Sequence, residues 1–251
     1  MAACALAALA LGATASAETV QRGGVRVQVD GEIAPKRLPR HGSAPVRVSV
    51  VTRIAALGGA PQPKLRRVTI EINRDGSISG AGLPACRLSD IQPATTAKAL
   101  AACRASLVGK GTFAADVSLG SRVRMPSSGA LHAFYGRYKG KPAILGHVYG
   151  RTPVPSSVTL VFVISERRKG RFGTVLTAQM PGAGGSAVTG MTLRLDRVLK
   201  RGGKRRGFVS AGCPAPRGFP GATFPLVRTR LDFAGGRTVS TTVSRQCRAR
   251  G

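Results

Sequence analysis

Acidic and aromatic residues are scarce in this sequence. Of its 251 residues, 10 are Asp or Glu and 39 are Lys or Arg, which gives a formal net charge of +29, and Trp is absent. The acids stand singly, which argues against a glycosidase built on a pair of carboxylates. Basic and aromatic residues are not interleaved as they are in stacking platforms for single-stranded nucleic acid. We therefore expect no specific nucleic-acid recognition.

Long hydrophobic runs are lacking after residue 18. A membrane-spanning helix needs about 20 apolar residues, so no transmembrane segment is expected. The one apolar run, residues 1–14, is shorter than that and leads into Ala15-Ser16-Ala17, a small-x-small pattern followed by polar chain. This arrangement is typical of a cleaved secretory signal. We predict a signal peptide over residues 1–17 and a single domain over residues 18–251 that is secreted or held in the cell envelope.

The signal segment departs from the usual pattern in one respect. Secretory signals normally begin with Lys or Arg, and the first cation here is Arg22. We expect either a misplaced start codon or a missing short upstream piece. A lipid anchor on Cys4 is the alternative, but the apolar stretch of such a signal should precede the cysteine, and here it follows. The secretory interpretation is therefore favoured.

Closely spaced cysteines of the Cys-x-x-Cys type are missing, which argues against a structural zinc site. Cleavage of the signal would remove one of the five cysteines and leave four. An even number of cysteines in an exported protein indicates disulfides, and four cysteines allow three pairings. We predict Cys86–Cys103, which would staple a helix to the segment before it, and Cys213–Cys247, which would clamp two strand ends.

Short runs of alternating apolar and polar residues dominate the rest of the chain. Residues 25–29, 46–50 and 68–72 are examples, and a period of two predicts half-buried strands. One segment, around residues 93–107, has the Ala and Leu spacing of a short α-helix and is stopped by two glycines. About ten strands and one helix indicate an all-β fold, an antiparallel β-sandwich built largely from hairpins.

Turn length fixes the register of two of the predicted hairpins. A two-residue turn at Lys139-Gly140 would place His132 directly opposite His147. A three-residue loop at residues 234–236 would place Leu231 opposite Val239, which keeps one face of that hairpin apolar.

The facing pair His132 and His147 is the one candidate metal site in the sequence. Two imidazoles on one face of a sheet would be about 5 Å apart at their β-carbons. A third ligand is not evident, and structural metal sites need more than two. We therefore favour an ordinary packed sheet and expect neither a metal nor another cofactor.

Basic residues gather in certain turns. In an antiparallel meander, alternate turns fall at the same end of the sheet. From residue 129 onward, this places four basic turns at one end, the fourth marked by Arg237. The connections expected at the other end, 151–157, 181–187 and 214–222, are rich in Pro and Gly, and Cys213–Cys247 is expected there too. The first three basic turns supply the candidate anion-binding residues Arg137, Lys139, Lys141, Arg167, Arg168, Lys169, Arg171, Lys200, Arg201, Lys204, Arg205 and Arg206.

Two simpler explanations compete with a functional basic end. Hairpin turns are generally solvated and often charged. The frequent Arg, Ala, Gly and Pro, with Asn occurring once, are also what coding bias produces. Against these, a chain this basic attracts anions such as acidic envelope polymers. The sequence leaves all three explanations open.

Several patches of the sequence form a pattern. They are Gly82-Leu83-Pro84-Ala85-Cys86 with residues 99–103 and 107–111, Gly140-Lys141-Pro142-Ala143-Ile144-Leu145 with residues 147–150, and Ser210-Ala211-Gly212-Cys213-Pro214-Ala215-Pro216. The pattern covers most of the mature chain and resembles a group of exported proteins of high-GC actinobacteria that have no assigned activity. The resemblance is consistent with export and paired cysteines, and it supplies no catalytic residue.

Motifs for catalysis are also missing, since neither a nucleophile elbow nor a phosphate-binding loop occurs. We expect a non-enzymatic binding protein outside the cytoplasm, monomeric or weakly associating, with a basic end for an anionic polymer. The alternatives are a secreted hydrolase whose site the sequence does not reveal and a structural surface protein. A deep pocket with converging polar side chains would favour the hydrolase.

Overall fold

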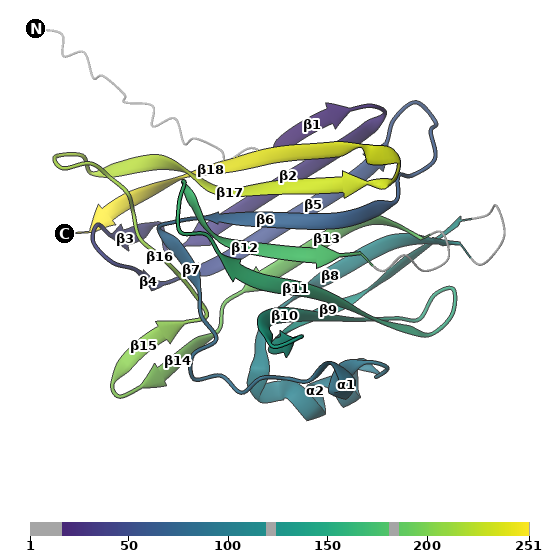
Figure 1. The fold of residues 1–251 in the computed structure, drawn as a ribbon, viewed down its shortest axis with the longest axis horizontal. Helices are drawn as coiled ribbons and strands as arrows, with labels where there is room; N and C mark the ends of the chain where they lie inside the picture. Colours follow the sequence, from purple (N-terminus) through teal and green to yellow (C-terminus); the bar gives the residue numbers. More distant parts are fainter. Residues whose placement is uncertain (1–16, 119–123, 181–185, 251) are drawn as a thin grey trace, which may run out of the picture.

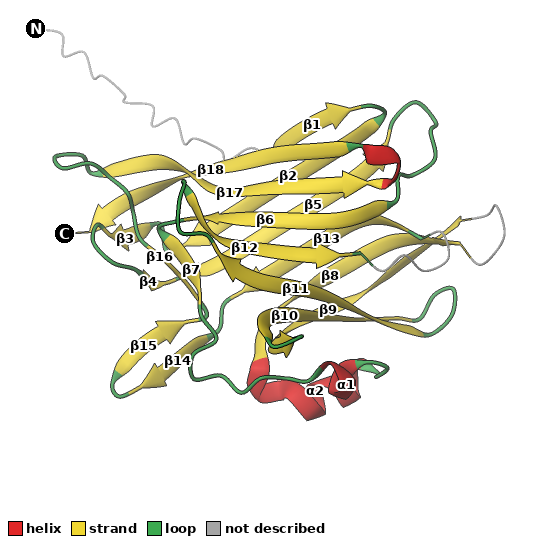
Figure 2. Cartoon of the chain, in the orientation of Figure 1, coloured by secondary structure: helices red, strands yellow, loops and turns green. Residues whose placement is uncertain are grey.

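The computed structural model describes residues 17–118, 124–180 and 186–250. The predicted signal peptide, residues 1–17, lies outside the described residues except for Ala17. In the described part, strands predominate and form a 13-stranded sheet that curls into a half-barrel (Figure 1, Figure 2). Neighbouring strands in this sheet are antiparallel apart from the last pair. The predicted all-β, antiparallel architecture is confirmed.

The order of strands across the main sheet differs from their order in the chain. In space the strands are β1 (Glu18–Arg22), β2 (Val25–Ala34), β5 (Arg47–Ala56), β13 (Ala187–Leu195), β8 (Leu107–Ser118), β9 (Arg124–Tyr138), β10 (Lys141–Gly150), β11 (Ser156–Glu166), β12 (Phe172–Gln179), β6 (Leu65–Asn73), β17 (Gly221–Phe233), β18 (Thr238–Arg250) and β3 (Arg37–Pro39). Two small sheets accompany it. They are β14 (Val198–Arg201) with β15 (Lys204–Gly207), and β4 (Ala44–Pro45), β16 (Val209–Ala211) and β7 (Gly76–Ile78).

The curl brings the two halves of the main sheet face to face. In Figure 1, strands β11, β12, β6, β17 and β18 lie in front of β1, β2, β5, β13 and β8, and the halves join through β9 and β10. One hydrophobic core takes side chains from both halves, including Val25 and Val27 of β2 and Val239 and Val243 of β18, all at most 1% exposed. The two layers expected of a sandwich therefore belong to one continuous sheet.

The helical segment begins before the predicted 93–107 and is divided into short pieces. It consists of α1 (Leu88–Ile91), α2 (Thr96–Cys103) and the 3-10 turn η1 (Arg104–Ser106). The Thr95 side chain caps α2 by accepting a hydrogen bond from the Lys98 amide, and β8 already begins at Leu107. The helices cover the outer face of β9 and β10, where a second, smaller core contains the fully buried Phe134 and Leu145.

Both hairpin registers agree with the prediction. His132 pairs with His147 across β9 and β10, and the turn between them has Lys139 and Gly140 at φ of 50° and 77°. Two positive φ values in a two-residue turn match the right-handed twist of the flanking strands. Leu231 pairs with Val239 across β17 and β18, with the 3-10 turn η3 (Ala234–Gly236) between them.

Both predicted disulfides are confirmed. Cys86–Cys103 has a Cα–Cα distance of 5.4 Å and ties α2 to the segment before α1. Cys213–Cys247 has a Cα–Cα distance of 5.7 Å and ties the segment after β16 to β18. Among the described helices, none is both long and apolar enough to cross a membrane.

Candidate anion-binding site

Strand direction determines which turns share an end of the main sheet. Strand β10 is antiparallel to both β9 and β11, and β8 is antiparallel to both β9 and β13. Strands β9, β11 and β13 therefore run the same way and end at the same edge. The β9–β10 turn, the β11–β12 turn and the β14–β15 hairpin that follows β13 all lie at that edge, as predicted. We call it the basic end, defined by residues 137–141, 167–171 and 200–206.

The side chains of the basic end are nearly all exposed and unpaired. Among those the structure describes, which leaves out Arg201, only Arg167 forms an ion pair, with Glu71. Arg137 donates a hydrogen bond to the Gly140 carbonyl oxygen at 3.0 Å. This acceptor is neutral, so the positive charge of Arg137 is not compensated by it. Lys139 lies 5.6 Å from the centre of the Tyr138 ring. These cations remain available to an external anion.

The fourth predicted basic turn is not at this end, so that prediction was wrong. Strand β17 is antiparallel to β6, so it begins at the basic end, and the turn that contains Arg237 lies at the opposite end. For the same reason, Cys213–Cys247 and the connection 214–220 lie at the basic end rather than the uncharged one. The pairing of these cysteines was right, but the reason given for it was wrong.

The cause of this error is a departure of the chain from the main sheet. After β13 the chain forms the separate β14–β15 hairpin and then enters the three-stranded sheet through β16. Assigning turns to the two ends by counting strands assumes that every strand crosses the main sheet. Strands β14, β15 and β16 do not cross it. The connection 151–155 does lie at the end opposite the basic end, and residues 181–185 are outside the described residues.

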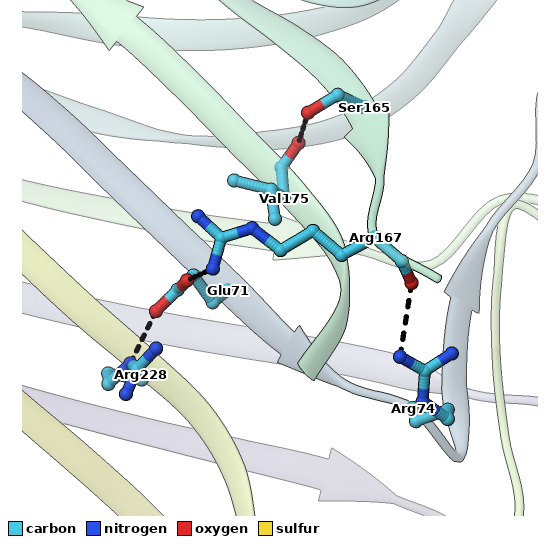
Figure 3. Close-up of polar contacts among 6 residues, drawn as sticks. All are labelled: Glu71, Arg74, Ser165, Arg167, Val175 and Arg228. Atoms are coloured by element: carbon cyan, nitrogen blue, oxygen red, sulfur yellow. Dashed lines mark hydrogen bonds and ion pairs between the residues drawn. The ribbon is translucent and has the colours of Figure 1, made fainter. Parts of the chain in front are cut away.

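Glu71 anchors the β11–β12 turn from the outer face of β6. Its carboxylate accepts hydrogen bonds from Arg167 and Arg228, and the side chain is 7% exposed (Figure 3). The hydrogen bond from Arg228 is the main influence that lowers the pKa of Glu71 below 4.5, and it outweighs burial, which acts in the opposite direction. The charges of Arg228 and Arg167 lower this pKa further. Arg167 is therefore a structural cation rather than a free one.

Arg74 holds the same turn from the other side. Its guanidinium donates to the carbonyl oxygen of Arg167 at 3.1 Å (Figure 3). It also donates to the carbonyl oxygen of Gly170 at 2.9 Å. Sequence reasoning missed both Arg74 and Glu71, because each looked like an ordinary polar residue of an alternating strand or its turn. Together they fix the backbone that presents Arg168, Lys169 and Arg171 to solvent.

A hollow of about 240 Å³ adjoins the β14–β15 hairpin. Its lining residues include Arg205 and Arg206 of β15 and the serines Ser43, Ser79 and Ser210. Guanidinium groups and hydroxyls can donate hydrogen bonds to the oxygens of phosphates and carboxylates. The hollow was not foreseen, because Ser43, Ser79 and Ser210 come from distant parts of the chain that only the small sheet brings together.

The predicted histidine pair is present, with His147 buried and His132 half-buried. His147 is 0% exposed, and burial is the main cause that lowers the pKa of both His132 and His147 below 6.5. The backbone of Ile91 opposes this at His147, although neither ring nitrogen there makes a hydrogen bond of normal geometry within the described structure. Among the described residues, no group of three possible metal ligands occurs. The arrangement is that of two neutral histidines in a covered sheet face.

Comparison with known proteins gives little further guidance. No family model matches the chain, and no curated protein does. One solved structure, described as "AvmM Catalyzes Macrocyclization in Alchivemycin A Biosynthesis", aligns with 94% of this chain and 97% of its own at 10% identity and a TM-score of 0.26. A likeness at that TM-score supports no conclusion about this chain.

Proposed function

We propose that this protein is an extracytoplasmic binding module that holds an anionic polymer at its basic end. The observation that supports this most is the gathering of exposed cations from three separate turns at one edge, where only Arg167 has an acidic partner in the described structure. Their charges are uncompensated, so the folded protein keeps a strong positive potential there.

The spacing of the turns favours a polymer over a small anion. The β9–β10 and β11–β12 turns are two strands apart, which is roughly 10 Å at the usual strand spacing, and the β14–β15 hairpin belongs to a separate sheet. A single phosphate or carboxylate cannot reach all three. A polymer that carries many such groups can reach all three turns. The hollow beside Arg205 and Arg206 would hold one of its anionic groups.

The disulfides support the location. Two disulfides are expected in a protein that folds in an oxidising compartment and are rare in cytosolic ones. Acidic polymers of the cell envelope are found in the compartment that such a protein would occupy.

The test is the salt dependence of binding to inorganic polyphosphate. Each cation that binds a polyanion releases counterions, so the logarithm of affinity falls with the logarithm of salt concentration in proportion to the number of phosphates neutralised. Replacing Lys200, Arg201, Lys204, Arg205 and Arg206 by Gln should flatten that slope by about one unit for each phosphate that is no longer neutralised.

The control variant removes the same charge from another part of the surface. Arg22, Arg53, Lys64, Arg66 and Arg237 lie towards the opposite end of the sheet and are exposed. Replacing these five by Gln should leave the slope close to that of the unmodified protein. Equal slopes for the two variants would mean that net charge alone drives binding and would refute a specific basic end.

A further inference from the structure

The loop that leads into β17 carries the most exposed large hydrophobic side chain of the described structure. Phe219 is 60% exposed, compared with 48% for Val154 and 36% for Met125. The loop, residues 214–220, connects β16 to β17 and extends beyond the main sheet (Figure 1). Exposed aromatic rings are favoured where a protein binds a partner, because they offer a large contact area. Phe219 therefore marks a candidate binding surface.

The backbone of this loop is held in place from two sides. The Arg40 guanidinium donates hydrogen bonds to the carbonyl oxygens of Ala215 at 2.6 Å and Phe219 at 2.8 Å. Cys213, directly before the loop, forms the disulfide with Cys247 of β18. A loop that is fixed in advance loses little conformational entropy when a ligand binds. The Phe219 ring is thus presented from a backbone that is already positioned.

An open hollow of about 630 Å³ lies beside Phe219, and its lining also includes Thr223 of β17 and Gln246 and Arg248 of β18. We call it the Phe219 hollow, defined by these four residues. Thr223 is directly opposite Gln246 in the register of β17 and β18. Arg248 shares a face of β18 with Gln246, because side chains two positions apart on a strand point the same way. The volume is within the range of about 300–1,000 Å³ that is typical of small-molecule sites.

The polar side chains of the Phe219 hollow are free to bind a ligand. Thr223, Gln246 and Arg248 are exposed, and none of their side chains forms a hydrogen bond or an ion pair with another described residue. The Thr hydroxyl and the Gln amide can each donate and accept hydrogen bonds. The Arg248 guanidinium has the forked geometry that suits a carboxylate. The hollow therefore combines an apolar ring, two groups for neutral hydrogen bonds and one cation.

A sugar ring that carries a carboxylate matches all of these groups. The C–H face of a pyranose is apolar and can pack on an aromatic ring, while its hydroxyls exchange hydrogen bonds with Thr223 and Gln246. A phosphate group would use Arg248 but would leave the Phe219 ring without a contact. A membrane would surround the ring but would take water from the hydroxyl and the amide without replacing their hydrogen bonds, which costs free energy.

We propose that the Phe219 hollow binds one hexuronate unit of an acidic polysaccharide, with the sugar ring on Phe219 and the carboxylate on Arg248. The hollow lies where β17 begins and β18 ends, which is the same end of the main sheet as the basic turns. The inference rests on the proposed function and names the class of polymer. The basic end attracts the polymer through its charge, and the hollow recognises its sugar.

The test is calorimetric titration of the folded chain with trigalacturonate, with inorganic polyphosphate as the anion that lacks a sugar. Phe219→Ala should weaken trigalacturonate binding about fivefold, as expected for the loss of one aromatic contact. The same change should leave polyphosphate binding as it is. The matched control is Val154→Ala, which removes an exposed hydrophobic side chain at the opposite end of the sheet and should change neither affinity.

A second pair of variants locates the carboxylate. Arg248→Gln should weaken trigalacturonate binding about tenfold and remove its preference over the neutral methyl ester of the same trisaccharide. Arg250→Gln removes an equally exposed cation of β18 that does not line the hollow, and it should keep that preference. High salt should reduce the effect of Arg248→Gln and leave that of Phe219→Ala unchanged, because salt screens charges but not apolar contacts.

The outcomes separate this inference from the proposed function. If polyphosphate binds at the basic end while Phe219→Ala and Arg248→Gln leave trigalacturonate binding unchanged, the sugar site is wrong and the polymer site stands. If the unmodified protein binds neither ligand, both are wrong. A Phe219→Ala variant that loses binding to phosphatidylglycerol vesicles but keeps its affinity for trigalacturonate would assign the ring to a membrane and overturn the sugar site.

Discussion

Arg245 donates a hydrogen bond from Nε to the carbonyl oxygen of Gly31 at 2.6 Å, although the two residues lie 214 positions apart in the chain. Arg245 is on β18 and Gly31 is on β2, near opposite ends of the curled sheet. The same guanidinium forms an ion pair with Asp30 and is 8% exposed. This hydrogen bond and ion pair close the seam between the two halves of the sheet.

Replacing Arg245 by Met should therefore weaken the whole fold. The change leaves the Gly31 carbonyl without its donor and removes the guanidinium from the Asp30 carboxylate. Asp30 keeps the hydrogen bond from the Gly31 amide and some contact with water. We expect the free energy of unfolding to fall by about 2–3 kcal/mol, as measured by urea denaturation. Arg248→Met on the exposed side of the same strand should change it by less than about 0.5 kcal/mol. Similar decreases in both variants would show that Arg245 does not close a seam.

Glu71→Gln tests the anchor of the β11–β12 turn. The amide keeps the shape of the side chain but removes the charge that Arg167 and Arg228 share. Because both arginines are about half exposed, we expect a modest destabilisation of about 1–2 kcal/mol at pH 7. The pKa of Glu71 is lower in the folded than in the unfolded protein, so its contribution is lost as pH falls through the folded pKa below 4.5. The two proteins should thus converge in stability in strong acid. A gap that persists there would mean that the charge is not the cause.

His132 and His147 should make the fold sensitive to mild acid. Burial lowers the pKa of His132 and His147 below 6.5 in the folded protein. The unfolded chain then binds more protons just below pH 6.5, and stability falls as pH drops through that window. The slope should approach about 1.4 kcal/mol per pH unit for each histidine that stays neutral.

Chemical denaturation at pH 5.0 to 7.5 measures this slope. His147→Leu should reduce it, whereas His41→Leu should not, because His41 is exposed. If the slope of stability against pH is the same in the unmodified protein and in both variants, His147 is not the group that titrates.

Features set by local geometry could be predicted from the sequence. The pairings His132–His147 and Leu231–Val239 follow from turn length and alternation, both of which act over a few residues. The cysteine pair Cys86–Cys103 follows from its position around one helix. Each of these needs no knowledge of how distant strands are arranged.

Features set by distant strands could not be predicted. Residues 198–207 contain the Gly202-Gly203 turn of an ordinary hairpin, and nothing local shows that β14 and β15 leave the main sheet. Arg237 was therefore assigned to the wrong end. Glu71 has the pattern of a solvent-facing residue and is covered only because Arg167 and Arg228 fold over it.

The location of polymer binding is the central claim, and lysine footprinting tests it most directly. Acetylation followed by mass spectrometry measures the reactivity of each exposed lysine with and without inorganic polyphosphate. The account predicts protection of Lys139, Lys141, Lys169, Lys200 and Lys204 at the basic end, with Lys64 and Lys98 unchanged. Uniform protection of all seven, or protection of Lys64 and Lys98 alone, would contradict it.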